Sequence, residues 1–324
     1  MAWIITYMIA SYDDKWWKIY NIFYSVDFYR EDLMTNTAKA TINIDNIKDI
    51  WYWKYWIIWI DEPNFISVTD LDKYNYLTKN TPWAIVKLWW EYRFYPINIL
   101  EKHQIINDKI AGTHFSIAYS PYSWVLVWFN RRVWENILKF WTSWKVYESW
   151  DLLYDFKTES LWSLSTLEAL VWDYYWTKLD YINITTSTLW AFLDNYENWR
   201  ILIAPENSDK NYQESKFEEY AFNDEIKFDL LNSINISYWV KEKFIVINDR
   251  ESWESLVFNL SDLITEKEWI LQVWNDYYKA EIENSEIKVT KNYSPIEHFY
   301  EYWFSWSNIN FWNDNIWAAQ KKDE

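Results

Sequence analysis

The middle of this chain alternates between short apolar runs and polar residues, and the runs have the lengths of strands. AIVKL (84–88) and EYRFYP (91–96) predict the two strands of a hairpin. HFSIAYS (114–120) alternates as a strand does, and WVLVWFN (124–130) is apolar enough for a buried strand. INILEKHQIIND (97–108) carries its isoleucines and leucine at the spacing of one helix face, which predicts a short helix.

The flanking segments extend the same pattern. ILKFW (137–141) and KVYES (145–149) predict two further short strands, and DEPNFISVTD (61–70) predicts a loop that leads into a strand. Turns recur roughly every 8–12 residues and helices are few, which is typical of strand-rich folds. We therefore expect an α+β fold, predominantly β, with short antiparallel strands, and not a doubly wound sheet.

The chain divides into four parts by composition. They are an irregular N-terminal extension (1–50), a core domain (51–203), a polar linker or long loop (204–230) and a second part (231–324). VKLWWEYRFYP (86–96) weakly resembles ISYWVKEKFIV (236–246), with Trp and Phe at matching places. The second part is therefore predicted to be a degenerate repeat, although this similarity alone leaves a duplicated architecture open.

Glycine and tryptophan occur in unusual numbers. The chain has 1 Gly and 29 Trp, whereas average usage gives roughly 23 Gly in a chain of this length. Many Trp residues stand where glycine normally marks a turn, as in Ser123-Trp124, Ser143-Trp144 and Trp89-Trp90. We therefore expect that most of them stand for glycine, as happens when UGA codons read as glycine by a cell are translated as tryptophan.

The printed sequence also has an energetic cost. A bulky side chain forced into a packed site costs about 1–3 kcal/mol, and a turn with positive φ disfavours any residue other than glycine. Native proteins are stable by only about 5–15 kcal/mol. We therefore expect the chain as printed to pack poorly. The alternative is a genuinely tryptophan-rich protein.

Charge and composition exclude several classes of function. The net charge is −17 and no basic stripe is visible, so we expect neither a nucleic-acid partner nor binding to an anionic membrane surface. The absence of Cys excludes disulfides and thiolate chemistry. No apolar run is long enough to span a bilayer. MAWIITYMIA (1–10) lacks a basic region and a cleavage site, which predicts a cytoplasmic protein, or an envelope or secreted one if the start codon is mis-assigned.

Several ordered motifs resemble a known family once glycine is restored at most Trp positions. They are YPINILEKHQIIND (95–108), YSPYS (119–123), FNRR (129–132), KFWTSWKVYESWDLLYDFKTESLW (139–162) and YWFSW (302–306). The chain resembles the uncharacterised bacterial family catalogued as domain-of-unknown-function family 3179, whose form of the fourth motif has glycine at Trp141 and Trp144. By the same resemblance Trp162, Trp303 and Trp306 are genuine tryptophans.

The chain departs from the family pattern at two places. The family usually has Cys-Pro-x-Cys where this chain has Ser120-Pro121-Tyr122-Ser123, and Glu follows His where this chain has Gln104. Any redox or metal role of the cysteine pair is therefore absent here. The resemblance implies a fold and a set of motif positions, and it implies no established activity.

The first candidate for chemistry is the polar group around His103. As a general base, His103 would use Asp108 as its orienting partner, and Asn107 would share its helix face. The alternative is a polar cluster that caps the helix and begins the next turn ahead of Gly112. Ser120 and Ser123 end a predicted strand, where a nucleophile could be presented, but no G-x-S-x-G pattern surrounds them, and a hydroxyl-rich turn is the alternative.

The second candidate is an Arg–carboxylate pair. Arg131 could shape a pocket with a downstream carboxylate, since Arg binds carboxylates in a planar fork. Asp155 is our first choice for that carboxylate, and the alternative is a Thr/Asp-based turn in DFKTES with Trp162 packed in the core. The candidate catalytic residues are thus His103, Asp155 and Arg131. The candidate binding residues are Tyr95, Asn107, Asp108, Ser120, Ser123, Ser143, Ser160 and Trp162.

Metal and cofactor sites receive little support. His103 and His114 have no H-x-x-x-H or H-E-x-x-H spacing, so no metal site is predicted, and His298 belongs to no motif. No phosphate-binding glycine loop is visible, and the cofactor and the partner, whether small molecule or protein, stay unidentified. The sequence favours a non-catalytic binding or envelope-associated module. The alternative is a hydrolase-like enzyme, which requires His103 and Asp155 to converge in one pocket.

Overall fold

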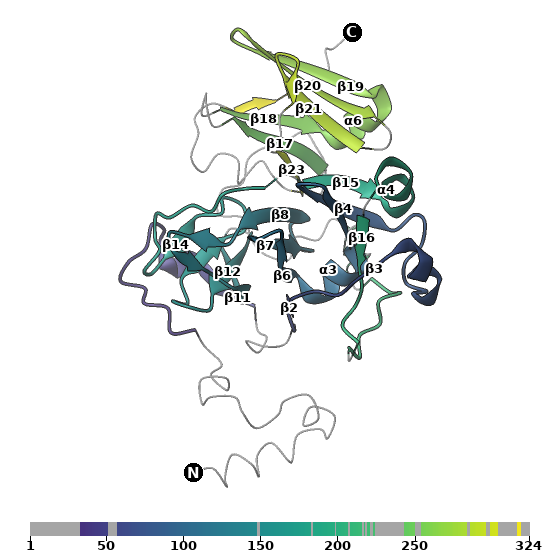
Figure 1. Cartoon of the computed structure of the whole chain (residues 1–324). Helices are drawn as coiled ribbons and strands as arrows, with labels where there is room; N and C mark the ends of the chain where they lie inside the picture. The colour runs from purple at the N-terminus through teal and green to yellow at the C-terminus, as the bar shows by residue number, and fades with distance from the viewer. Residues whose placement is uncertain are drawn as a thin grey trace. The chain divides into compact units, whose positions relative to one another are not determined.

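The structure is a computed structural model of the whole chain (Figure 1). It describes residues 33–50, 57–147, 150–182, 184–197, 199–206, 208–215, 217, 219–220, 223, 243–249, 254–283, 286–295, 299–303 and 316–318. The chain separates into two units, Met1–Met34 and Thr35–Glu324. Almost all described residues belong to the second unit, and the account below concerns that unit.

A four-stranded sheet lies at the centre of the first half of this unit. Its strands run in the order β2-β6-β7-β8, and every neighbouring pair is antiparallel except β2–β6. The bounds are β2 (Ile60–Asp61), β6 (Ile105–Ile110), β7 (Thr113–Ser120) and β8 (Val125–Asn130). The strands predicted at 114–120 and 124–130 are confirmed.

Both faces of this central sheet are buried. Along β7, Phe115 and Ile117 belong to one hydrophobic core, whereas Ala118, the residue after Ile117, belongs to the core on the other face. A strand that alternates between two cores needs apolar residues at successive positions. This explains the continuous apolar run of β8, in which Val127 and Trp128 enter different cores.

One face of the central sheet packs on a five-stranded sheet of order β1-β11-β12-β13-β14 (Figure 1). Its strands are β1 (Ile47–Asp49), β11 (Phe140–Tyr147), β12 (Trp150–Asp155), β13 (Leu161–Ser163) and β14 (Ala169–Val171). The prediction of two short strands at 137–141 and 145–149 is wrong. Residues 140–141 and 145–147 belong to one strand, β11, whereas Ile137 lies in a separate two-residue strand and 148–149 lie outside the described residues. β11 is interrupted by a bulge between Thr142 and Lys145, and Trp144 in the bulge has φ 56°.

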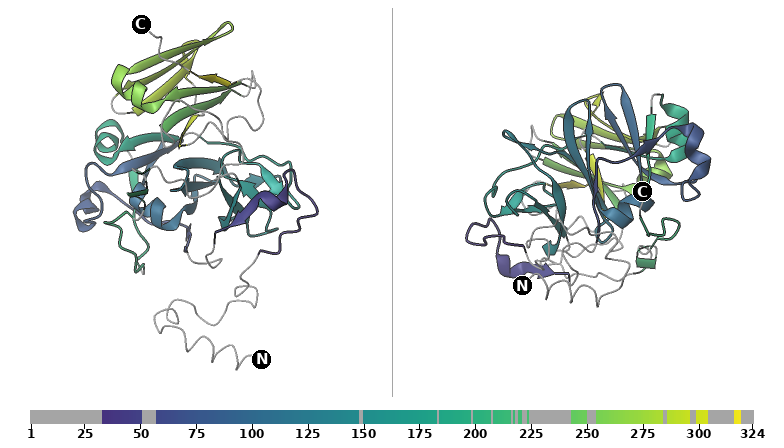
Figure 2. Two further views of the ribbon diagram at one scale, coloured as in Figure 1. Left: turned by 180° about the vertical axis from the view of Figure 1, so that it is seen from behind. Right: turned by 60° about the horizontal axis from the view of Figure 1, so that its bottom comes forward.

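The other face packs on a second five-stranded sheet of order β15-β4-β5-β16-β3, seen beside the central strands in both views of Figure 2. Its strands are β3 (Phe65–Ile66), β4 (Pro82–Leu88), β5 (Glu91–Pro96), β15 (Ile184–Thr188) and β16 (Trp199–Leu202). β4 and β5 form the predicted hairpin. Helix α4 (Leu189–Asn195) covers the far side of this sheet through Leu189 and Phe192, with its first turn capped by Thr188.

The segment 97–108 is not one helix, which corrects the prediction. Helix α3 (Ile97–His103) follows Pro96 directly and ends at Gln104, whose φ is 56°. Such a left-handed residue reverses the chain at a helix end. The β-branched pair Ile105-Ile106 then opens β6, so Asn107 and Asp108 are strand residues and do not share a helix face with His103.

Short elements complete this half. The 3-10 helices are η2 (Ile44–Asn46) and η3 (Val68–Lys73), and β9 (Arg132–Val133) pairs with β10 (Asn136–Ile137). The segment 61–70, predicted as a loop that leads into a strand, contains the two-residue strand β3 and the first three residues of η3. The helices within the described residues are all too short or too polar to cross a membrane.

The second half contains two four-stranded sheets and a helix that share one core. The first sheet has the order β23-β17-β18-β24, and the second has the order β19-β20-β21-β22. The bounds are β17 (Lys243–Asp249), β18 (Glu254–Asn259), α6 (Leu260–Glu266), β19 (Glu268–Val273), β20 (Asp276–Glu283), β21 (Glu286–Lys291), β22 (Ser294–Pro295), β23 (Phe299–Trp303) and β24 (Ile316–Ala318). With the first half, these elements confirm an α+β fold that is predominantly β.

One series of elements occurs in both halves. The hairpin β4–β5, helix α3 and strands β6–β8 are matched in order by β17–β18, α6 and β19–β21. From β5 through β7 the bounds differ by a constant 163 residues: 91 becomes 254, 97 becomes 260, 105 becomes 268 and 113 becomes 276. Both helices end at a residue with positive φ, Gln104 and Lys267. This register differs from the pairing of 86–96 with 236–246 that the sequence suggested.

The two hydrophobic cores also correspond position by position. Leu100 of α3 and Leu263 of α6 are buried at the same place in the series, as are Phe115 and Tyr278. Further corresponding pairs are Tyr95/Phe258, Ile110/Val273, Ile117/Ala280, Leu126/Ile287 and Trp128/Val289. The first half and the second half therefore contain one structural repeat each, which we call repeat 1 and repeat 2.

Candidate functional site

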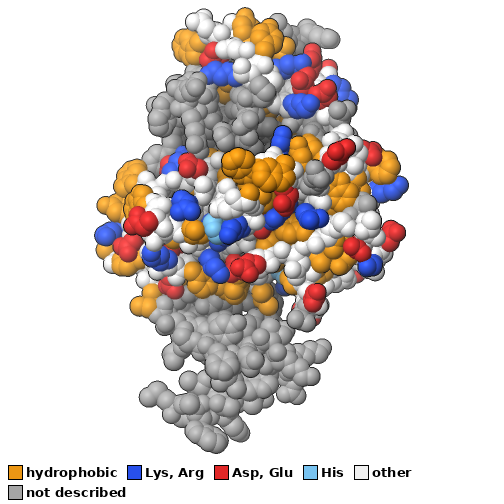
Figure 3. All heavy atoms as spheres, viewed as in Figure 1, with side chains coloured by type: hydrophobic (Ala, Val, Ile, Leu, Met, Phe, Trp, Pro, Cys, Tyr) orange, Lys and Arg blue, Asp and Glu red, His pale blue; other side chains and the backbone are white. Residues whose placement is uncertain are grey.

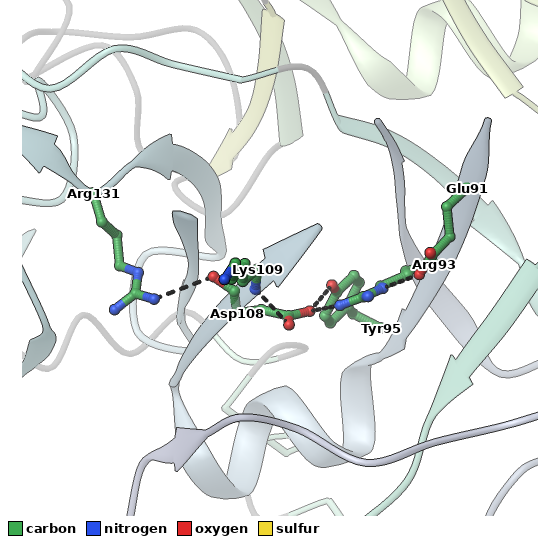
Figure 4. A network of polar contacts seen from close by, with 6 residues as sticks. All are labelled: Glu91, Arg93, Tyr95, Asp108, Lys109 and Arg131. Carbon is green, nitrogen blue, oxygen red and sulfur yellow. Dashed lines mark hydrogen bonds and ion pairs between the residues drawn. The ribbon is translucent and has the colours of Figure 1, made fainter. Parts of the chain in front are cut away.

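Asp108 on β6 is the centre of a buried polar network between the central sheet and the β4–β5 hairpin (Figure 4). Its Oδ2 accepts hydrogen bonds from Arg93 Nη1 (2.5 Å) and Tyr95 Oη (2.6 Å), and its Oδ1 accepts one from the Lys109 backbone N–H (2.6 Å). Arg93 also pairs with Glu91. Burial and the Asp108 charge hold the pKa of Tyr95 well above its usual value, so the phenol keeps the proton that it donates.

Arg131 joins this network from the residue after β8. Its Nη2 donates to the main-chain oxygen of Asp108 (3.2 Å), and its Nη1 donates to Leu138 O (3.0 Å). The side chain is buried, and its Nε has no hydrogen-bond partner. Arg131 therefore does not form the predicted pair with Asp155. Its hydrogen bonds go to carbonyl oxygens, and the carboxylates of Asp61 and Asp108 attract its charge from nearby without forming an ion pair.

Repeat 2 has the same backbone without this network. The positions that correspond to Arg93, Tyr95 and Asp108 are Leu256, Phe258 and Leu271. Leu256 and Phe258 are fully buried, and Leu271 packs against the same core. Since apolar residues build this fold in repeat 2, the fold itself does not require the charged network of repeat 1.

His103 lies at the end of α3 with both ring nitrogens occupied. Nδ1 lies 2.5 Å from Ile58 O, and Nε2 lies 2.7 Å from the hydroxyl of Tyr212. A carbonyl oxygen only accepts, so Nδ1 carries the proton of the neutral ring. Burial lowers the pKa of His103 to about 4, although the hydrogen bond to Ile58 opposes this shift. Tyr212, which is also 2.6 Å from Ser208 Oγ, thereby joins the loop after β16 to α3.

Asn107 faces the opposite side of β6 from Asp108. Its Nδ2 donates to Phe140 O (3.1 Å), and its Oδ1 accepts from the Phe140 N–H (3.1 Å) and from Ser116 Oγ (2.7 Å). The side chain therefore joins the central sheet to the start of β11. This is a fully satisfied buried amide, as interior polar groups normally are.

Asp155 ends β12 and organises the turn that follows. Its Oδ1 accepts from the backbone N–H groups of Lys157 (3.1 Å) and Thr158 (2.8 Å), and its Oδ2 accepts from Trp162 Nε1 (3.0 Å). Ser160 hydrogen-bonds Thr158 Oγ1 and the N–H of Tyr174. Trp162 is fully buried in the core. This is the turn with a core tryptophan that was the alternative interpretation of DFKTES.

The three candidate catalytic side chains are not brought together. Each of His103, Arg131 and Asp155 has its own set of partners, and no hydrogen bond or ion pair joins any two of them. Among the described residues, no group of three His, Asp or Glu side chains has the arrangement of a metal site. His298 and Trp306 lie outside the described residues, and of Trp303 only the backbone is described.

A family model described as "Protein of unknown function (DUF3179)" matches residues 57–273, which is more than half of the chain. The chain belongs to this family. The match begins before β2 and ends with β19, so it includes all of repeat 1 and the beginning of repeat 2. No curated protein and no solved structure matches the chain.

The DUF3179 match includes the two serines that stand where we expected the family's cysteines. Ser120 ends β7 and its Oγ accepts from the Ser123 N–H (3.3 Å), while the Ser123 hydroxyl is buried without a partner. Asp151 of β12 is buried beside them, and its Oδ2 also lacks a partner. Burial raises the pKa of Asp151 to about 6, and a hydrogen bond with Ser120 opposes the rise.

The last candidate, Ser143, stabilises the bulge in β11. Its hydroxyl donates to Leu152 O (2.5 Å) and accepts from the Lys145 N–H (3.1 Å). Sequence analysis did not single out Arg93, Tyr212 or Asp151. The groups that they contact lie on other elements, so no local spacing predicts these contacts. The one available signal is a charged or phenolic residue within an apolar segment, since such a residue needs a partner when it is buried.

Asp151 and His103 are expected to oppose each other in the pH dependence of stability. Asp151 has a raised pKa, so its protonated form favours the folded state and stability is lost as the pH rises from about 4 to about 6. His103 has a lowered pKa, so stability is lost as the pH falls from about 6.5 to about 4. Each shift corresponds to roughly 3 kcal/mol, and the two effects offset each other in this protein.

The variant Asp151→Asn separates the two effects. We expect it to raise the free energy of unfolding by up to about 3 kcal/mol at pH 8, because it removes a desolvated charge, and to change it little at pH 4. Urea unfolding between pH 4 and pH 8 measures the difference. An equal effect of the substitution at pH 4 and at pH 8 would contradict a raised pKa of Asp151 in the folded protein.

Proposed function

We propose that this DUF3179 chain is a non-catalytic binding module whose binding surface lies in repeat 1. The observation that carries the proposal is the contrast at three positions, where repeat 1 has the partly buried Arg93 and the buried Tyr95 and Asp108, and repeat 2 has Leu or Phe. A buried ion pair is weak support for stability, because desolvation offsets much of its attraction. A polar network that the fold does not need therefore suggests a role in recognition.

The surroundings of the candidate catalytic residues support the same proposal. A general base must be free to take a proton near the operating pH. His103 has both nitrogens occupied and a pKa of about 4, and Asp155 is engaged by its own turn. Such groups hold structure together. Envelope association, the other form of this hypothesis, stays a prediction.

A turnover assay tests the proposal against the hydrolase alternative. Wild type and His103→Gln are incubated with p-nitrophenyl acetate, p-nitrophenyl phosphate and p-nitrophenyl glucoside. We expect both to release p-nitrophenol at the rate of the buffer. His114→Gln is the control for the acetate ester alone, since a partly exposed imidazole can react with acetate esters by itself. A wild-type rate that falls at least tenfold only in His103→Gln would overturn the proposal.

A thermal-shift screen tests the binding itself. A ligand that binds only the folded state raises its stability by about 2.7 kcal/mol at 100 times Kd. Screening phosphorylated metabolites, sugars, amino acids and acidic or basic peptides is therefore expected to find a compound that raises Tm by several degrees. A screen in which none of these classes raises Tm would contradict a binding module.

A further inference from the structure

Four basic residues meet at one end of the central sheet. In the β6–β7 hairpin, Lys109 lies directly opposite His114. The N–H of Arg131 donates to His114 O (3.0 Å), which fixes the residue after β8 alongside them, and Arg132 follows. Lys109 and Arg132 are exposed, and His114 is half-buried. In Figure 3 a pale-blue histidine lies among blue side chains on the face toward the viewer. We call these four residues the basic cluster.

The cations of the basic cluster form no ion pair with a carboxylate. Most other lysines of the described residues form ion pairs, as Lys139 does with Asp61 and Lys39 does with Asp173. Among the described residues, no ion pair involves Lys109, Arg131 or Arg132. Burial and these three neighbouring charges lower the pKa of His114. An acidic chain with 48 Asp and Glu against 31 Lys and Arg thus leaves three adjacent cations without an ion pair, and only Arg131 is attracted by nearby carboxylates, those of Asp61 and Asp108.

Arg131 gives the basic cluster a fixed positive charge. Only 6% of its surface is exposed, and it hydrogen-bonds two main-chain oxygens rather than a carboxylate. Its buried Nε has no hydrogen-bond partner. A buried charge acts through a low dielectric, so its attraction for an anion at the adjacent surface is stronger than that of an exposed lysine.

Repeat 2 provides a comparison with the same backbone and different side chains. The positions that correspond to the basic cluster are Gln272, Tyr277, Asn292 and Tyr293. The N–H of Asn292 donates to Tyr277 O (2.8 Å), which is the counterpart of the bond from Arg131 to His114. The backbone arrangement therefore forms without any positive charge at these positions. The charges of the basic cluster belong to repeat 1 alone, as the Asp108 network does.

We propose that the basic cluster binds a phosphate group, with Lys109, His114 and Arg132 as direct contacts and Arg131 as a supporting charge. A phosphate monoester carries about −1.5 to −2 charges at pH 7, which suits three unpaired cations better than a single carboxylate does. Arg binds phosphate oxygens in a bidentate fork, and Lys binds them as a point charge. The inference rests on the proposed function, because it names the ligand class of that binding surface.

Isothermal titration calorimetry with two probes tests this site. Sodium phosphate and glycerol 3-phosphate are titrated separately into wild type and into the double variant Lys109→Gln/Arg132→Gln. The double variant Lys39→Gln/Lys73→Gln is the matched control, since it changes the net charge equally at two exposed lysines that have acidic partners. Circular dichroism and Tm without ligand establish that each variant is folded.

We expect the first double variant to bind at least tenfold more weakly than wild type, and the control to stay within twofold. Tighter binding of glycerol 3-phosphate than of phosphate indicates an organic phosphate ester as the ligand, and equal binding indicates phosphate itself. Wild-type binding no stronger than in the first double variant, or heats no greater than those of sodium chloride at equal ionic strength, would overturn the inference. The turnover assay with His103→Gln is independent of this result, so failure of the proposed function is recognised separately.

Discussion

Replacing four exposed tryptophans together by glycine is expected to raise the free energy of unfolding by about 4 kcal/mol, or Tm by roughly 8–16 °C. They are Trp89, Trp134, Trp176 and Trp274. Each has a positive φ, between 53° and 69°. The left-handed conformation costs a residue with a side chain about 1–2 kcal/mol, and glycine adopts it freely.

The loss of these side chains removes little burial. Each of the four tryptophans is between 67% and 75% exposed, so only a small apolar area returns to water. The greater freedom of glycine in the unfolded chain costs up to about 1 kcal/mol per site. The net gain is therefore about 1 kcal/mol at each position.

Trp190→Gly is the control for this prediction. Trp190 is 48% exposed, and it lies in helix α4, where φ is that of a regular helix. Glycine in a helix interior is about 1 kcal/mol less favourable than alanine, so we expect this variant to be less stable than wild type. Urea unfolding of the control and of the fourfold variant measures both effects. A fourfold variant less stable than wild type would sink the argument.

Other tryptophans are in conformations or packing that glycine would suit better. Trp124, Trp144 and Trp172 also have positive φ. The ring centroids of Trp59 and Trp141 lie 3.0 Å apart, whereas aromatic pairs prefer about 4.5–7 Å. These features support the hypothesis that glycine occupies many Trp positions in the natural protein, which stays a prediction. The mass of the tryptic peptide FWTSWK (140–145) from the native source tests it directly.

Local sequence patterns were sufficient to predict most strands of repeat 1. The β4–β5 hairpin follows from two apolar runs joined by Trp89-Trp90, and β8 follows from its unbroken apolar run. The helix predicted over 97–108 failed because Ile105 and Ile106 satisfy the spacing of a helix face as well as that of a strand. The chain reverses at Gln104, and pairing with β7 places these isoleucines in β6.

The candidate site was predicted only in part. Asp108 and Tyr95 were among the candidate binding residues, but Arg93, which completes their network, was not. The contact depends on how the hairpin packs on the central sheet, and no spacing in the sequence encodes it. His103 shows the same limit, because its contact with Tyr212 is set by tertiary packing. The turn that Asp155 forms with Trp162 in the core, by contrast, was one of the two alternatives that the sequence left open.

Replacing the Asp108 network by the residues of repeat 2 is expected to leave the protein at least as stable as wild type. The variant is Arg93→Leu/Tyr95→Phe/Asp108→Leu, which copies Leu256, Phe258 and Leu271. A buried ion pair replaced as a whole by apolar residues is often neutral or stabilising by about 1–4 kcal/mol. Glu91 loses a partner in this variant, but its side chain is 31% exposed and can be hydrated.

Single substitutions in the same network are expected to behave in the opposite way. Arg93→Leu leaves the Asp108 carboxylate buried without its cation, and Asp108→Leu leaves Arg93 and the Tyr95 hydroxyl without their acceptor. Breaking one side of a buried pair costs about 3–5 kcal/mol. The single variants therefore serve as controls for the triple variant, since they change the same core without restoring a consistent set of partners.

The central claim is that the Asp108 network of repeat 1 serves binding rather than folding, and the free energy of unfolding of the triple variant tests it most directly. Urea unfolding at pH 7 compares wild type, the triple variant and the two single variants. The account predicts a triple variant within about 1 kcal/mol of wild type, or above it, and single variants lower by about 3–5 kcal/mol. A triple variant that loses as much as either single variant would show that repeat 1 needs this network in order to fold, and would contradict the claim.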